Sequence, residues 1–143
     1  MYVWVSGKIT DSFPSDVGVK QGDPLSPLLF GLFIDRMEGI IRDHLPAASG
    51  VQLLDMCLKV LLYADYLVLL AESPAELQAM LDLLHIFCEH KALTVNVKKS
   101  EAVIFNRQYC PGFRGMRLKY NEDDMRIVPS FVYLGMLYEY MTR

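Results

Sequence analysis

Apolar residues recur at the spacing of an α-helix in two segments of the chain. The first segment begins at Ser26, a good helix-capping residue, continues with Pro27 and ends before Pro46. The second begins with Ser-Pro-Ala-Glu at residues 73–76, the spacing of a capping box with proline at the first helical position. The apolar face of this second helix comprises Leu77, Met80, Leu81, Leu84, Phe87 and Cys88. Two amphipathic helices are therefore predicted.

Shorter apolar runs favour β-strands. A strand is predicted over residues 2–5, before the turn residues Ser6-Gly7. Residues 56–63 and 66–71 are almost continuously apolar, which suits two strands that are buried on both faces and meet at a tight turn. A buried helix is the competing interpretation of these residues, because a continuous apolar run does not separate a helix from a strand.

The last third of the chain predicts further strands. Residues 93–105 are expected to form a hairpin that turns at residues 98–100, and residues 131–140 a strand pair or a strand and a turn. Single helices that alternate with antiparallel hairpins predict an α+β fold, with helices on one face of an antiparallel sheet. No internal repeat or low-complexity tract interrupts residues 1–143, so one domain is expected.

Composition narrows the class of protein. The chain has 143 residues, of which 52% are hydrophobic, enough for one globular core. No uncharged apolar run of about 18 residues predicts a membrane span, and the first residues lack the pattern of a secretory signal. The three cysteines, Cys57, Cys88 and Cys110, are widely spaced and favour neither a disulfide framework nor a zinc site. They fit small buried side chains in a reducing compartment, whether nucleus, cytosol or organelle.

Charge is distributed unevenly along the chain. The net charge is −3, which argues against an obvious nucleic-acid-binding protein. Residues 1–85 hold 5 basic and 11 acidic residues, whereas residues 86–120 hold 7 basic and 2 acidic residues. The second segment is therefore either a solvated face or a surface that contacts phosphates.

Four motifs occur in the order found in reverse transcriptases. GVKQGDPLSPLLFGLFID at residues 18–35 resembles motif B, and YADY at residues 63–66 resembles the YADD hairpin, motif C. FCEHKALTVNVKKSEAVIF at residues 87–105 resembles motif D, and SFVYLGMLYEY at residues 130–140 is similar to the primer-grip hairpin, motif E. Their order and spacing resemble those of non-LTR (LINE-type) retrotransposon polymerases. The resemblance implies a truncated reverse transcriptase palm.

The resemblance also implies RNA-directed DNA polymerase activity with Mg²⁺, which needs several converging carboxylates. In the family, one carboxylate comes from an upstream strand and two adjacent ones come from the hairpin. Here Asp65 takes the first hairpin position and Tyr66 the second, and no upstream aspartate strand is recognised before Gly18. We therefore expect Asp65 to be a vestigial catalytic residue, at most a weak metal ligand, and no cofactor to bind. A turn aspartate that bonds its own backbone is the alternative.

The same resemblance implies nucleic-acid-binding roles for several residues. These candidates are Gln21, Gly22, Lys98, Lys99, Tyr133 and Gly135. The two motif B residues would face the incoming nucleotide and the template, the motif D lysine the nucleotide phosphates, and the two residues of the last hairpin the primer backbone. Each has a structural alternative: a loop that caps the following helix, a solvated turn, and packing in the core.

An apolar hairpin without a neighbouring strand exposes an unpaired edge that invites pairing. We expect the edge beside residues 56–71 to be covered by residues 2–5 or by a partner protein, and RNA to contact residues 88–119. The expected function is that of a catalytically inactive structural or RNA- or protein-binding subunit of a larger ribonucleoprotein assembly, such as an organellar ribosome. The alternatives are a LINE-type polymerase fragment, active only when another chain completes it, and a transposon remnant without a role.

Overall fold

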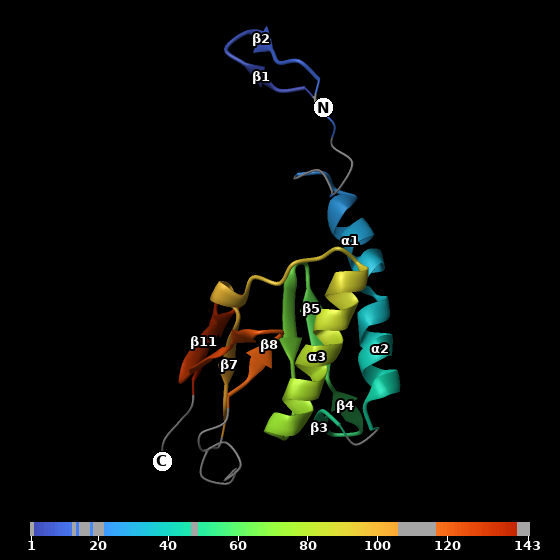
Figure 1. Ribbon diagram of the computed structural model, residues 1–143, viewed down its shortest axis with the longest axis vertical. Helices are drawn as coiled ribbons and strands as arrows, with labels where there is room; N and C mark the ends of the chain where they lie inside the picture. The colour runs from blue at the N-terminus through green and yellow to red at the C-terminus, as the bar shows by residue number, and fades with distance from the viewer. Residues whose placement is uncertain are drawn as a thin grey trace. The chain divides into compact units, whose positions relative to one another are not determined.

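The chain divides into two compact units, residues 1–34 and residues 35–143 (Figure 1). The computed structural model describes residues 2–12, 14, 18, 22–46, 49–105 and 117–139. The sequence-based expectation of a single domain over residues 1–143 stays a prediction.

A short hairpin occupies the start of the first unit. Strand β1 (Trp4–Val5) pairs antiparallel with β2 (Lys8–Ile9). Ser6 and Gly7 connect them with φ angles of 50° and 77°, the left-handed conformation that a two-residue hairpin turn requires. The sequence predicted the first strand and the turn. It missed the second strand, because two residues are too short a run to show alternation.

The first predicted helix is two helices in the structure, α1 (Ser26–Ile34) and α2 (Arg36–His44). The interruption falls at Asp35 (φ −52°, ψ −38°), where the second unit begins. The prediction of one unbroken helix was therefore wrong. α2 buries Met37 and Ile41, whereas α1 is apolar almost all round and exposes all three of its leucines.

The second unit contains two-stranded sheets. Its strands are β3 (Val51–Leu53), β4 (Met56–Leu58), β5 (Val60–Tyr63), β6 (Tyr66–Leu69), β7 (Glu101–Val103), β8 (Lys119–Tyr120), β9 (Asp123–Asp124), β10 (Arg126–Val128), β11 (Ser130–Tyr133) and β12 (Met136–Glu139). The pairs β3–β4, β5–β6, β8–β9 and β11–β12 are antiparallel, and β7–β10 is parallel. This combination of helices and mostly antiparallel strands confirms the predicted α+β class.

The hairpin predicted over residues 93–105 was wrong. Val97–Lys99 form one turn of 3₁₀ helix (η1), and β7 pairs with β10 rather than with residues 93–97. The backbone bonds locally here: the N–H of Lys99 donates to the carbonyl of Asn96 at 3.0 Å, and the Ser100 hydroxyl donates to the same carbonyl at 2.9 Å. These local bonds satisfy polar groups that a second strand would otherwise have paired.

Helix α3 (Pro74–His90) organises the core of the second unit. The N–H of Glu76 donates to Ser73 Oγ at 3.2 Å, which confirms the predicted helix start. The predicted apolar face is buried at Met80, Leu81, Leu84, Phe87 and Cys88. Through this face α3 lies against α2 and β8 (Figure 1). None of the helices in the described part of the chain is long and apolar enough to cross a membrane.

Glu76 also connects the start of α3 to the loop before β3. Its carboxylate accepts hydrogen bonds from the N–H of Gly50 and, at 3.2 Å, from the N–H of Glu72. Gly50 has φ of +99°, and a Cβ atom added to it would lie 2.6 Å from the carbonyl oxygen of Leu58. Only glycine combines this backbone conformation with so close an approach of β4.

Gly50→Ala is expected to lower the free energy of unfolding by about 1–3 kcal/mol, because the new methyl group meets backbone at a positive φ. Urea denaturation of the chain measures this. Gly39→Ala in α2 is the matched control, since its Cβ would meet only Arg42 Nη2 at 4.0 Å. That change should leave stability equal or raise it by up to about 1 kcal/mol. Equal effects of the two substitutions would contradict this account of Gly50.

A buried polar contact joins α3 to β8. The Cys88 thiol lies beside the Tyr120 hydroxyl, and the His85 ring meets the Tyr120 ring edge to face at 5.4 Å between centroids. Burial raises the pKa of Cys88 and, more strongly, the pKa of Tyr120. Both groups are therefore held neutral in the folded chain.

Stability should fall as the pH rises above about 9, because the unfolded chain releases these two protons at lower pH than the folded chain does. Tyr120→Phe removes the larger of the two shifts and should make the fall shallower. The free energy of unfolding in urea, measured across this pH range for both proteins, tests the expectation. A profile that has the same slope in the variant would contradict it.

Candidate functional site

Asp65 lies at the tip of the β5–β6 hairpin, as the sequence predicted. Tyr63 pairs with Tyr66 across the strands, and Ala64 and Asp65 form the two-residue turn, with Ala64 at φ 51°. The Asp65 side chain is exposed. Within the described ranges its carboxylate has neither a hydrogen bond nor an ion pair. The alternative interpretation, an aspartate that accepts a hydrogen bond from the backbone of its own turn, is therefore not supported there.

The residues around this tip do not fit a two-metal site. Paired Mg²⁺ ions need several carboxylate oxygens at one point. Among the residues that the structure describes, no three His, Cys, Asp or Glu side chains are grouped so that they could hold a metal ion. The residue beside Asp65 is Tyr66, a neutral phenol whose side chain is a poor ligand for a hard cation. A metal pair here would need ligands from other parts of the protein or from another chain.

Tyr66 instead contacts Tyr133 of the last hairpin. The two rings meet edge to face, with centroids 6.4 Å apart and an interplanar angle of 83°. This contact brings two of the predicted motifs together, the YADY hairpin and the hairpin of β11 and β12. No local sequence pattern predicted this contact, because Tyr66 and Tyr133 are far apart in the chain.

Two of the predicted nucleic-acid-binding residues, Tyr133 and Gly135, lie at the tip of the β11–β12 hairpin. Leu134 and Gly135 form its turn with φ angles of 50° and 80°, which explains the glycine. Nothing lies within 4 Å of the position that a Cβ on Gly135 would take, so the tip is open on that side. Tyr133 is half-buried, as the alternative of packing against the rest of the chain requires.

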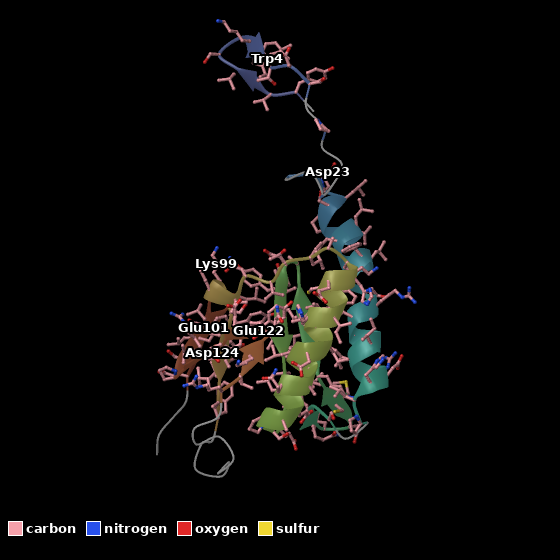
Figure 2. The ribbon with its side chains drawn as sticks, viewed as in Figure 1. Trp4, Asp23, Lys99, Glu101, Glu122 and Asp124 are labelled. Carbon is pink, nitrogen blue, oxygen red and sulfur yellow. The ribbon has the colours of Figure 1, made fainter. Side chains whose placement is uncertain are left out.

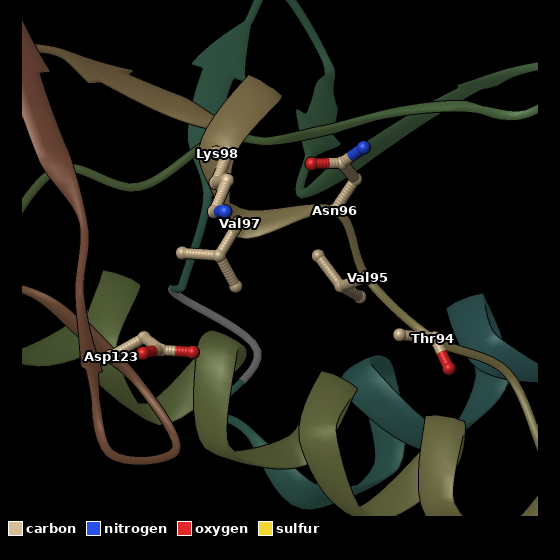
Figure 3. A pocket seen from close by; sticks show the side chains of 6 residues that line it. All are labelled: Thr94, Val95, Asn96, Val97, Lys98 and Asp123. Carbon is tan, nitrogen blue, oxygen red and sulfur yellow. The ribbon is translucent and has the colours of Figure 1, made fainter.

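Lys98 and Lys99 lie in η1 rather than in a hairpin turn. Lys98 lines an open hollow of about 420 Å³ (Figure 3). The other lining residues are Thr94, Val95, Asn96, Val97 and Asp123. Asp123 comes from β9 and places a carboxylate in the hollow with the lysine. Because Asp123 is remote from Lys98 in sequence, no local pattern predicted it. Asp65 is not part of this hollow.

Outside this hollow too, carboxylates lie beside residues of the basic segment 86–120. Arg117 pairs with Asp124 at 3.7 Å, and Arg126 pairs with Glu101 across the parallel strands β7 and β10. Figure 2 labels the two acidic residues, Glu101 and Asp124. Lys99 is exposed. The segment that is basic in sequence is therefore mixed in sign where the structure describes it. Its remaining arginines, Arg107 and Arg114, fall outside the described residues.

Of the two motif B candidates, Gln21 lies outside the described residues. Gly22 is exposed and has φ of 81°. The next residue, Asp23, accepts a hydrogen bond from the N–H of Leu25 at its Oδ1 (2.8 Å) and one from the N–H of Ser26 at its carbonyl (3.1 Å). These bonds lead the loop into α1 and agree with the structural alternative, a loop that caps this helix.

Known proteins resemble this chain over most of its length. The family model of reverse transcriptase (RNA-dependent DNA polymerase) matches residues 1–137. The chain is 39% identical over 93 residues to the retrovirus-related Pol polyprotein from the type-2 retrotransposable element R2DM of Drosophila melanogaster, which covers 65% of this chain and 8% of that protein. It is 31% identical over 99 residues to the Pol polyprotein from a type-1 element R2 of Popillia japonica, with 69% and 16% covered.

A further R2 Pol polyprotein, from Nasonia vitripennis, is 39% identical over 82 residues, covering 57% of this chain and 8% of that protein. The chain thus spans a small part of the length of each of these relatives. The family match, the R2 relatives and the α+β fold agree with the four motifs and their order. This chain belongs to the reverse transcriptase family, as a palm fragment of the non-LTR retrotransposon type.

Proposed function

We propose that this chain is a palm fragment of an R2-type RNA-directed DNA polymerase. By itself the fragment does not catalyse nucleotide transfer, and it acts as a structural or binding element of a larger assembly. The observation that supports this most directly is Tyr66. It occupies the position where the resemblance places the second hairpin carboxylate, and its ring is engaged with Tyr133.

The chemistry of nucleotide transfer explains why the identity of residue 66 matters. Mg²⁺ ions, when bound in a polymerase, clamp the attacking and leaving oxygens of the transferred phosphate. Asp65 provides one carboxylate at a rigid hairpin tip, which holds one metal at most and weakly. A phenol at position 66 adds neither negative charge nor a suitable oxygen, so the electrostatic stabilisation of the reaction is lost.

The alternative function is an active polymerase completed by carboxylates from elsewhere. The relatives are Pol polyproteins of which this chain covers 8–16%, so such residues can belong to the remainder of a longer protein or to a second chain. In that case Asp65 is the hairpin ligand of the assembled site, and Tyr66 reduces activity without abolishing it.

Primer extension on an RNA template, with Mg²⁺ or Mn²⁺, separates these functions. We expect the 143-residue chain to incorporate no nucleotide above the level of Asp65→Ala. Asp55→Ala is the matched control, because Asp55 is the second turn residue of the neighbouring β3–β4 hairpin. Incorporation that Asp65→Ala reduces by about 100-fold or more, and Asp55→Ala does not, would establish the alternative and contradict the proposal.

We also propose that a partner protein covers the β5–β6 hairpin. This ribbon pairs with no other strand among those the structure describes, and its side chains Leu61, Leu62 and Tyr63 are exposed by 38%, 38% and 59%. Long, unpaired apolar edges recruit other strands. Residues 2–5, the other cover considered from the sequence, pair with β2 through β1.

RNA contact through residues 88–119 is a weaker candidate, because Asp123, Asp124 and Glu101 lie among the basic side chains described there. Assembly partners are identified by what copurifies with the chain from native material. A stoichiometric ribonucleoprotein, an organellar ribosome included, would support the subunit role over an unassembled remnant.

Without a partner, the purified chain should self-associate as its concentration rises, because the apolar ribbon then pairs with another copy. Leu61→Lys places a charge on β5 and should shift the chain toward monomer in size-exclusion chromatography with light scattering. Ile86→Lys is the matched control, as Ile86 is exposed by 51% on helix α3, which offers no strand edge. A chain that remains monomeric at high concentration, or equal effects of the two lysines, would contradict the proposed edge.

A further inference from the structure

The contact between Tyr66 and Tyr133 joins two ribbons that share no backbone pairing. In the described part of the chain, β5–β6 and β11–β12 are separate two-stranded sheets. Inter-strand hydrogen bonds therefore do not set the position of one ribbon relative to the other. Contacts through other elements and between side chains set it instead, and the tyrosine pair is a direct side-chain contact between the ribbons.

The pair lies at the ends of both ribbons. Tyr66 is the first residue of β6, directly after the Ala64-Asp65 turn, and Tyr133 is the last residue of β11, directly before the Leu134-Gly135 turn. A contact at the tips restrains rotation of one ribbon against the other more strongly than a contact near a pivot would. The centroid separation of 6.4 Å and the angle of 83° are those of a favourable edge-to-face pair.

The contact is specific to Tyr66 among the tyrosines of this hairpin. Tyr63 lies opposite Tyr66 in the same register position and on the same face of the ribbon. The two tyrosines are exposed to a similar extent, Tyr63 by 59% and Tyr66 by 54%. Within the described residues, however, Tyr63 has no ring contact with Tyr133.

We infer that Tyr66 is a positioning residue, whose ring fixes the Asp65 turn against the Leu134-Gly135 turn. The significance of this role for Asp65 as a former catalytic residue rests on the proposed function, whereas the ring contact itself does not depend on it. Tyr66 then replaces a charged side chain with an aromatic link between the two tips. Tyr66→Asp would restore an acid but lose this link, so the position of the acid relative to the β11–β12 hairpin would no longer be fixed by the ring contact.

A double-mutant cycle tests the contact without any activity assay. Tyr66→Leu, Tyr133→Leu and the double variant are compared by urea unfolding of the 143-residue chain. We expect the double variant to be more stable than additive single effects predict, by about two- to tenfold in the folding equilibrium constant. Tyr66→Phe and Tyr133→Phe should keep the coupling, because the rings rather than the hydroxyls meet. The control cycle, Tyr63→Leu with Tyr133→Leu, should be additive.

Amide NMR shifts test the positioning role itself. Tyr133→Leu should move the Asp65 amide resonance, and Tyr66→Leu that of Gly135, although each is remote in sequence from the substituted residue. The matching phenylalanine variants should leave both nearly unchanged. If a leucine variant fails to fold, methionine at the same position keeps the apolar volume without the ring, and the same comparison is made.

An additive cycle between positions 66 and 133, or an Asp65 amide that does not respond to loss of the Tyr133 ring, would overturn the inference. Neither result depends on metal or nucleic acid. The proposed function fails if the chain incorporates nucleotides in a manner that depends on Asp65, and this can occur while Tyr66 and Tyr133 remain energetically coupled. The two failures are therefore distinguishable.

Discussion

A pair of divalent metal ions requires several oxygen ligands at one point, and the β5–β6 hairpin presents one carboxylate at its tip. The hairpin geometry suits a ligand well, since two paired strands and a two-residue turn hold Asp65 in place. What differs is the chemical character of the next residue. An aromatic ring at position 66 meets another tyrosine edge to face, so the tip makes an aromatic contact where a metal site would need a second carboxylate.

An aromatic contact in place of a carboxylate at position 66 is consistent with the way in which the second unit is held together. Its strands form separate pairs, and the contacts that unite them come from side chains and from α3. Glu76 bonds the loop at Gly50, the Cys88–Tyr120 contact connects α3 to β8, and the tyrosine pair connects two hairpin tips. In such an arrangement one aromatic contact has more influence on tip geometry than it would in a continuous sheet, where backbone hydrogen bonds fix the neighbours.

The sequence predicted those features whose causes are local. The cap at Ser73, the buried stripe of α3 and the turn at Asp65 follow from residues a few positions apart, and each is found. The parallel pairing of β7 with β10 depends on partners about 25 residues apart, such as Glu101 and Arg126, and no local pattern encodes such a register. The predicted hairpin around Lys98 was wrong because β7 pairs with the distant strand β10, while residues 97–99 close a 3₁₀ turn among themselves.

The same division applies to the candidate site. The position of Asp65 was predictable from the motif, but the partners that the fold brings to the other candidates were not: Tyr133 meets Tyr66, and Asp123 shares a hollow with Lys98. The most direct test of the central claim is the stoichiometry of Mn²⁺ binding, followed by electron paramagnetic resonance. The account predicts at most one weakly bound ion per chain and no spin-coupled pair. Two coupled Mn²⁺ ions per chain, lost together in Asp65→Ala, would contradict it.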